Sequence, residues 1–314
     1  MINELLQPAI IISILALAIR YSTPIIMSAF GEAIAQRAGI LNLGVEGTML
    51  TGAFVGFVVA EMTGSLWAGV LGALIAGGLL GFLMVFTAAT LKTDQVVTSL
   101  SINLLASGGT LYAYRTIYSG ASFSSPPFTE IFSTFKIPLL SEIPFIGEIL
   151  FTQQPLTYIA LLMGPLIWFF LYRTRYGLII RSIGETPRAA EMQGIRISRY
   201  QYLAVIAASM ISGVAGSFLT LGSSARFIQN ITQGRGWLVI VIVIAGKWHP
   251  LRILLAGLLF GLIDALQFQI QGIGVRIPYQ FLLMLPYIAA IVVMMGSRAR
   301  ADAPHQLGIP YHRE

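Results

Sequence analysis

Long runs of apolar residues, separated by short polar stretches, make up most of this chain of 314 residues. A hydrocarbon layer about 30 Å thick takes roughly 20 residues of helix, and the runs lack the strict alternation expected of a membrane β-barrel. The pattern predicts an all-α, polytopic transmembrane helical bundle with about nine spans (eight to ten), as a single domain over residues 1–314. The predicted spans are 8–30, 41–60, 66–90, 96–117, 156–172, 201–222, 236–247, 252–270 and 278–296.

The polar stretches between the runs predict the topology. Residues 173–199 carry six arginines, which is typical of a cytoplasmic loop. The same rule places the tail 297–314 inside and the N-terminus outside. Residues 119–155, which are acidic and rich in proline, are predicted to form an external loop that helps to receive a substrate-binding protein, with a plain connector as the alternative.

Composition narrows the class of protein further. Apolar residues make up 56% of the chain and charged residues 10%, which indicates an integral membrane protein. The formal charge of +6 follows the topology, so no nucleic-acid partner is expected. The chain has no cysteine and no phosphate-binding loop motif, and its three histidines lie in short polar segments. We therefore predict no catalytic residue, no metal site and no cofactor.

Glycine pairs at helical spacing occur in three predicted spans. Small residues four positions apart let helix backbones approach closely in lipid, so these pairs predict a tight multi-helix core. They are Gly52 with Gly56, Gly77 with Gly81, and Gly257 with Gly261.

One polar stretch, residues 183–195, has the signals of a complete short helix. Thr186 is a typical capping residue, Pro187 suits the first helical position, and Gly194 suits a left-handed residue just past the end. A helix of about two turns is marginal in water. We therefore expect it to be held by a membrane surface or by a partner protein.

This stretch resembles the coupling loop of ABC importer permeases, in which Glu-Ala-Ala is followed by Gly. The run from Gly31 to Gly47, with residues 94–97 and 234–237, is similar to the nucleoside and simple-sugar branch of the branched-chain amino acid and ribose permease family. The resemblance implies that the coupling residues are Gly184, Glu185, Pro187, Ala189, Ala190 and Gly194.

The resemblance also implies the partners. They are ABC ATP-binding subunits, a second permease subunit that is identical or related, an extracytoplasmic substrate-binding protein, and membrane lipid. ATP hydrolysis belongs to the separate ATP-binding subunit, so this chain is not expected to be an enzyme. The location implied is the cytoplasmic membrane of a prokaryote.

Aligned polar residues inside the spans suggest a translocation pathway. On the fourth span, Ser99, Asn103 and Ser107 recur at four-residue spacing. On the second span, Asn42 and Glu46 are predicted to share a face. On the eighth span, Asp264 shares a face with Gln267 and Gln271. The alternative is interhelical hydrogen bonding, worth about 0.6 kcal/mol per bond. A carboxylate in hydrocarbon costs about 2.5–3.5 kcal/mol, which makes Glu46 and Asp264 the strongest candidates, unless Glu46 pairs with Asn103 or Arg20.

A neutral polar pathway favours a neutral hydroxylated solute, and the family resemblance makes nucleosides the first expectation. Ribose-like sugars are the alternative. An ion-coupled secondary transporter is less favoured because only two acids were assigned to the pathway. The last alternative is a membrane scaffold that transports nothing, in which the polar stripes would serve only for packing between helices.

Overall fold

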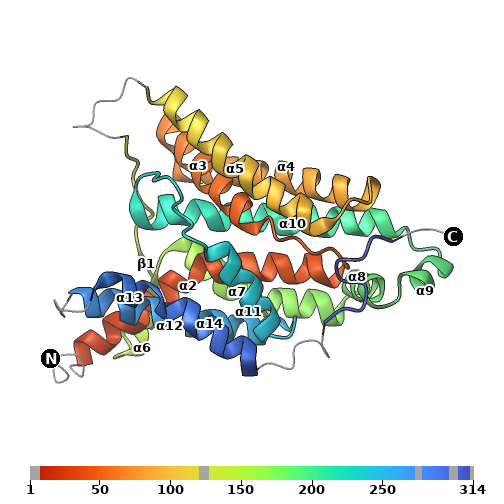
Figure 1. The fold of residues 1–314 in the computed structure, drawn as a ribbon. Helices are drawn as coiled ribbons and strands as arrows, with labels where there is room; N and C mark the ends of the chain where they lie inside the picture. The colour runs from red at the N-terminus through yellow and green to blue at the C-terminus, as the bar shows by residue number, and fades with distance from the viewer. Residues whose placement is uncertain (1–7, 120–126, 273–277, 297–302, 312–314) are drawn as a thin grey trace.

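The computed structural model describes residues 8–119, 127–272, 278–296 and 303–311, and these form a helical bundle (Figure 1). Seven of the described helices are long and apolar enough to cross a membrane, and two shorter apolar helices accompany them. The predicted all-α class is confirmed, with a helix at each of the nine predicted positions. The short helices coincide with the seventh and ninth predicted spans.

The helices follow one another along the chain with short connections. Between the fourth and fifth long helices, two-residue strands β1 (Phe135–Lys136) and β2 (Thr152–Gln153) pair antiparallel. The helices are α2 (Pro8–Arg37), α3 (Val45–Thr63), α4 (Leu66–Val85), η1 (Phe86–Thr90), α5 (Gln95–Ile117), η2 (Leu140–Glu142), α6 (Ile146–Leu150), α7 (Pro155–Arg173), α8 (Arg175–Glu185), α9 (Pro187–Met192), α10 (Ile197–Phe218), η3 (Leu219–Ser224), α11 (Arg235–Ala245), α12 (Pro250–Gly272), α13 (Tyr279–Leu283) and α14 (Leu285–Gly296).

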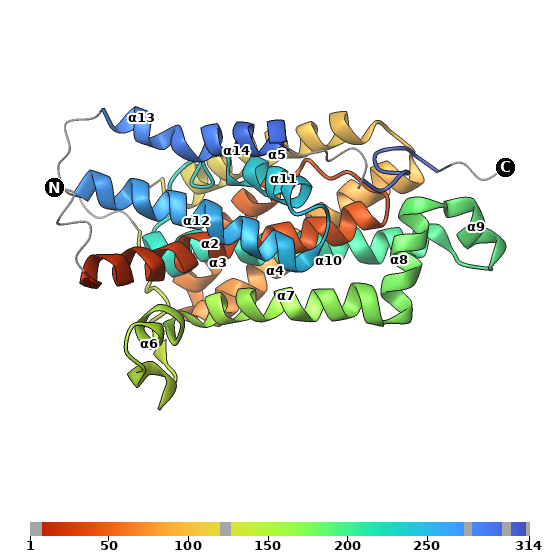
Figure 2. The ribbon, with the colours of Figure 1, turned by 90° about the horizontal axis from the view of Figure 1, so that it is seen from below.

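Helices α2 and α10 run through the middle of the bundle, with α3, α4 and α5 on one side and α7, α12 and α14 on the other (Figures 1 and 2). The predicted close approach of glycine-containing helices is confirmed. A Cβ added at Gly52 would lie 2.1 Å from the carbonyl oxygen of Gly213, and one at Gly261 would lie 2.3 Å from that of Ala18. Backbone contact of this kind replaces the hydrophobic drive that lipid does not supply.

Each end of the bundle carries short elements, and each end is named after one of them. The α9 end holds α9 and residues 303–311, and the α6 end holds α6 and the start of α2 (Figures 1 and 2).

Two predicted boundaries are wrong near the start of the chain. The first helix continues to Arg37 instead of ending at residue 30, because its polar residues Glu32 and Gln36 are buried and bonded to one another. The second begins at Val45 instead of residue 41, and the connection 38–44 between them is irregular backbone.

The predicted single helix over residues 183–195 is in fact two helices. Ile183, Gly184 and Glu185 belong to α8, and α9 spans Pro187–Met192. Thr186 separates them with non-helical dihedral angles (φ −141°, ψ 76°), and its side chain makes no capping bond, so the predicted cap is wrong. Pro187 at the first helical position and Gly194 with φ +79° are as predicted.

Candidate functional site

The irregular connection 38–44 is held from one side by α5. The side-chain oxygens of Gln95 and Ser99 accept hydrogen bonds from the backbone N–H groups of Leu41 (2.8 Å) and Leu43 (3.0 Å). Asn103 continues this row eight residues further along α5, about 12 Å from Gln95. Irregular backbone at membrane depth is tolerated where protein satisfies its polar groups, and the α5 row does this.

Asn103 satisfies two backbone groups at the start of α3. Its Oδ1 accepts from Gly47 N–H at 2.8 Å, and its Nδ2 donates to the Leu43 carbonyl at 3.0 Å. The N–H of Gly47 is one of the first-turn donors that have no partner inside a helix. The Asn103 side chain therefore caps α3 from a neighbouring span.

Glu32 holds the same connection from the other side. Its carboxylate accepts from Gln36 Nε2 (2.8 Å) and from Asn42 N–H (3.3 Å). The Asn42 side chain in turn accepts from Gly44 N–H (3.0 Å). Asn42 precedes α3, so the prediction that it shares a helical face with Glu46 is wrong. Sequence reasoning also missed Glu32 as a buried acid, although its spacing of four residues from Gln36 is a helical signal.

Glu46 caps the half-length helix α11. Its carboxylate accepts hydrogen bonds from the Thr232 hydroxyl (2.5 Å), Gly234 N–H (2.9 Å) and Gly236 N–H (2.6 Å). A helix N-terminus carries a partial positive charge and unpaired N–H groups, so a carboxylate there is stabilising. The partners expected for Glu46, Asn103 or Arg20, are both wrong, because the sequence did not place the N-terminus of α11 beside it.

Asp264 has different surroundings. It lines a cavity of about 390 Å³ with Gln267 and Gln271, so the predicted stripe on this helix does face a common space. Tyr21, Arg235 and Tyr287 also line the cavity. The Asp264 carboxylate makes no hydrogen bond to any described residue. It lies eight residues, about 12 Å along the helix axis, before the last residue of α12.

Ser107 lies apart from both groups. It is exposed on α5, and neighbouring Gly108 and Gly109 have no heavy atom within 4 Å of an added Cβ. Helix α5 is the least apolar of the seven long helices, and most of its length is not buried inside the bundle. Its open face carries the apolar side chains of Leu104 and Leu105 beside Ser107 and the two glycines.

The predicted coupling residues are close together at the α9 end. Glu185 forms an ion pair with Arg37 at 3.5 Å, and a Cβ at Gly184 would lie 2.3 Å from the Arg37 carbonyl oxygen. This explains why glycine stands at 184: α8 rests against the end of α2. Ala190 is 4% exposed and packs with Ile183 and Ile197, whereas Ala189 is exposed.

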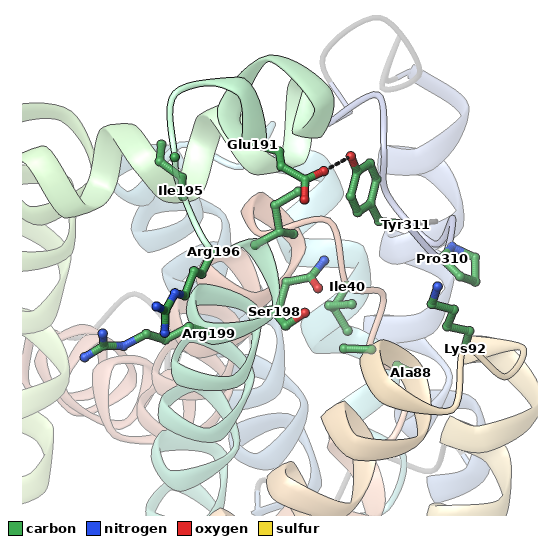
Figure 3. A pocket seen from close by; sticks show the side chains of 14 residues that line it. Ile40, Ala88, Lys92, Glu191, Ile195, Arg196, Ser198, Arg199, Pro310 and Tyr311 are labelled. Carbon is green, nitrogen blue, oxygen red and sulfur yellow. Dashed lines mark hydrogen bonds between the residues drawn. The ribbon is translucent and has the colours of Figure 1, made fainter. Parts of the chain in front are cut away.

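A C-terminal strap, residues 303–311, ties these elements together. Gln306 N–H donates to the Gly184 carbonyl (2.8 Å), and Gly308 N–H donates to the Gly39 carbonyl (3.2 Å). The strap ends at Tyr311, whose hydroxyl donates to the Glu191 carboxylate at 2.5 Å (Figure 3). It therefore joins α8, α9 and the connection 38–44, a contact that sequence reasoning missed for lack of any periodic signal.

Two cavities flank the strap. One of about 520 Å³ lies between α9, the start of α10 and Lys92, with Tyr311 on its wall (Figure 3). The other, about 350 Å³, is lined by Arg37, Glu185, His249 and Arg252 among others. Burial lowers the pKa of His249, and the charges of Arg252 and Arg37 lower it further, so this imidazole is neutral at pH 7. Within the described ranges, no group of three acidic, histidine or cysteine side chains could hold a metal ion.

Comparisons with known proteins extend over nearly the whole chain. Residues 13–294 match the family model described as "Branched-chain amino acid transport system / permease component". The chain is 34% identical to the guanosine ABC transporter permease protein NupQ of Bacillus subtilis (strain 168), over 93% of each protein. It is also 34% identical to the nucleoside ABC transporter permease protein NupC of Lactococcus lactis, over 93% of this chain and 94% of that protein.

A third relative is named for a different solute. TsgC13 of Haloferax volcanii, a provisionally named glucose ABC transporter permease, is 34% identical over 94% of this chain and 96% of its own length. No solved structure matches the chain significantly. The resemblance predicted from the sequence motifs is confirmed.

Proposed function

Because the chain belongs to the permease-component family of branched-chain amino acid transport systems, and its spans enclose a polar cavity, we propose that it imports nucleosides as the permease subunit of an ATP-driven transporter. The single observation that carries the solute class is the cavity around Asp264. The cavity is lined by one carboxylate, one guanidinium, three glutamines and two tyrosines, which offer hydrogen bonds to a hydroxylated molecule, and its volume lies within the usual range for small-molecule sites.

The proposed assembly contains two permease subunits, two ABC ATP-binding subunits and an extracytoplasmic substrate-binding protein, in the cytoplasmic membrane of a prokaryote. The second permease subunit faces the open side of α5, where Ser107 and the adjacent glycines are exposed. The translocation pathway lies along this face and reaches the Asp264 cavity.

Coupling occurs at the α9 end, which is cytoplasmic in this proposal. Exposed Ala189 enters a groove of the ATP-binding subunit, while buried Ala190 fixes α9 to the permease. Movement of α9 passes through the C-terminal strap to Gly39 and the connection 38–44, and then to Glu46 at the start of α11. This is a rigid-body form of alternating access.

Orientation is tested by engineered cysteines, since the chain has none. Ser124→Cys, at a position outside the described residues, should react with an impermeant reagent in intact cells. Ser182→Cys on α8 should not. Labelling of Ser182→Cys from outside would reverse the orientation.

The function itself is tested by uptake in proteoliposomes that contain the permease, its ATP-binding subunit and its binding protein. Labelled guanosine should accumulate with ATP, and not with an ATP-binding subunit whose phosphate-loop lysine is replaced. If unlabelled ribose or glucose inhibits the uptake of labelled guanosine more strongly than unlabelled nucleosides do, the sugar alternative is correct. Uptake that follows a proton or sodium gradient without ATP would select a secondary transporter, and absence of any uptake by the intact assembly would favour a scaffold.

A further inference from the structure

An apolar groove runs along the outside of the bundle between α7 and α10. Its volume is about 780 Å³. Met163, Leu166 and Phe170 of α7 form one wall, and Leu203, Ala207 and Ile211 of α10 form the other. Leu166 and Leu203 are 64% and 58% exposed, so the groove is open to the surroundings of the bundle and does not belong to its interior.

The groove has the length of one membrane leaflet. It extends along α10 from Arg199 to Ile211, twelve residues or about 18 Å. Half of a 30 Å hydrocarbon layer is about 15 Å. A single acyl chain that enters at the α9 end would therefore lie in the groove over its whole length.

The α9 end of the groove is polar. The polar residues that line it are Tyr176, Arg199 and Tyr200. Helix α8, which carries Tyr176, lies across the end of α7 instead of continuing it (Figure 2). Its Tyr176 and Leu178 are 63% and 60% exposed. Tyrosines and a transverse helix at the end of a span mark the depth of the lipid headgroups.

This end is also positively charged. The side chains of Arg196 and Arg199 extend on the same side of the first turn of α10 (Figure 3). Neither guanidinium has an ion-pair partner among the residues that the structure describes. No acidic side chain lines the groove. The site therefore combines an apolar slot with a cationic entrance at headgroup depth.

We propose that this groove binds one anionic phospholipid, with an acyl chain between α7 and α10 and the headgroup phosphate at Arg199, assisted by Arg196. Arginine binds phosphate oxygens through its planar fork of donors. A second copy of this chain is a poorer occupant, because a symmetric contact would bring two such arginine clusters together. The proposal does not depend on which solute is transported.

The test is native mass spectrometry of the full-length chain released from nanodiscs of equal phosphatidylglycerol and phosphatidylcholine. The wild-type chain should retain phosphatidylglycerol preferentially. Arg199→Gln should lower the ratio of the two retained lipids about fivefold, the effect of one arginine at a charged membrane surface. Arg199→Lys should keep most of the preference. Arg252→Gln, in the first turn of α12 and outside the groove, is the matched control and should leave the ratio unchanged.

A second pair of variants tests the slot. Ala207→Trp should fill the groove and displace the lipid, whereas Leu255→Trp, at an exposed position of α12, should not. An unchanged lipid ratio in Arg199→Gln, or an equal effect of Arg252→Gln, would overturn the proposed headgroup site. Retention of phosphatidylglycerol by Ala207→Trp at the wild-type level would overturn the proposed acyl-chain slot.

Discussion

Glu46 and Asp264 are both carboxylates within membrane-spanning helices, yet the structure treats them in opposite ways. Glu46 accepts three hydrogen bonds from the chain around the start of α11. Asp264 accepts none from the described residues and faces a cavity. A buried polar group whose capacity is already used holds the fold, whereas one with spare capacity beside an open space is available to a ligand. We therefore propose that Glu46 supports the fold and that Asp264 contacts the solute.

The largest expected effect is that of Glu46→Ala. This change leaves the Thr232 hydroxyl and two N–H groups at the start of α11 without an acceptor, and each unsatisfied buried group costs about 1–3 kcal/mol. We expect little folded protein, measured by fluorescence-detected size exclusion and thermal unfolding in detergent. Asp264→Ala is the matched control and should remain folded. Equal stability of the two variants would remove the distinction between the acids.

Asn103→Leu should have the next largest effect. It removes the partners of Gly47 N–H and the Leu43 carbonyl and should destabilise the protein by about 2 kcal/mol. Ser107→Ala, one turn further along the same helix but exposed, should change stability by less than about 0.5 kcal/mol. If both variants unfold at the wild-type temperature, the α5 row does not support the connection 38–44.

Asp264→Asn should change transport and not folding. The amide keeps the volume of the side chain but removes its charge and one acceptor. We expect the KM of uptake to rise about tenfold or more, which corresponds to a loss of about 1.4 kcal/mol or more of binding free energy. Thermal stability should stay near that of the wild type. The sharper comparison is Glu46→Gln, which should lower stability more than Asp264→Asn does. Wild-type uptake kinetics in Asp264→Asn would exclude the cavity from the pathway.

The smallest effect on folding, though not on function, is expected for the strap. Tyr311→Phe removes the hydrogen bond from the Tyr311 hydroxyl to Glu191, and the loss of one such bond costs about 1 kcal/mol. If the strap transmits movement, the stimulation of ATP hydrolysis by loaded binding protein should fall while unstimulated hydrolysis stays constant. Gln306→Ala is the comparison variant, because it keeps the backbone N–H contact to Gly184 and removes a side-chain hydrogen bond within the strap, to the Ile309 carbonyl, that does not reach α9. Full stimulation in Tyr311→Phe would exclude this contact from coupling.

Much of the fold follows directly from the sequence, because a span is a local property. Runs of about 20 apolar residues identify each long helix, and Pro187 and Gly194 mark the limits of α9 with chemistry that acts within a few residues. Ala189 and Ala190 show the limit of such reasoning. The motif names both, but only packing against Ile183 and Ile197 shows that Ala190 is buried and Ala189 is available to a partner.

The candidate pathway was harder to predict because hydrogen-bond partners lie far apart in the chain. The Ser99 and Asn103 spacing correctly predicts a helical stripe, yet nothing local shows that the stripe faces the irregular connection 38–44 and the first turn of α3. Glu46 bonds to residues 232–236, nearly 190 positions away. A third acid, Glu32, fell outside the predicted first span because polar residues end an apolar run even where the helix continues.

The most direct test of the account is the ATPase activity of the complete reconstituted complex with substrate-loaded binding protein. Ala189→Glu places a charge on the exposed face of α9 without disturbing Ala190, and Gly194→Val replaces a residue whose φ of +79° strains any β-branched side chain. Gln193→Glu, exposed on the same segment, is the control for added charge. We predict folded, membrane-inserted complexes in which Ala189→Glu and Gly194→Val lose substrate stimulation and Gln193→Glu keeps it. Full stimulation and uptake in both altered complexes would show that α9 is not the coupling element.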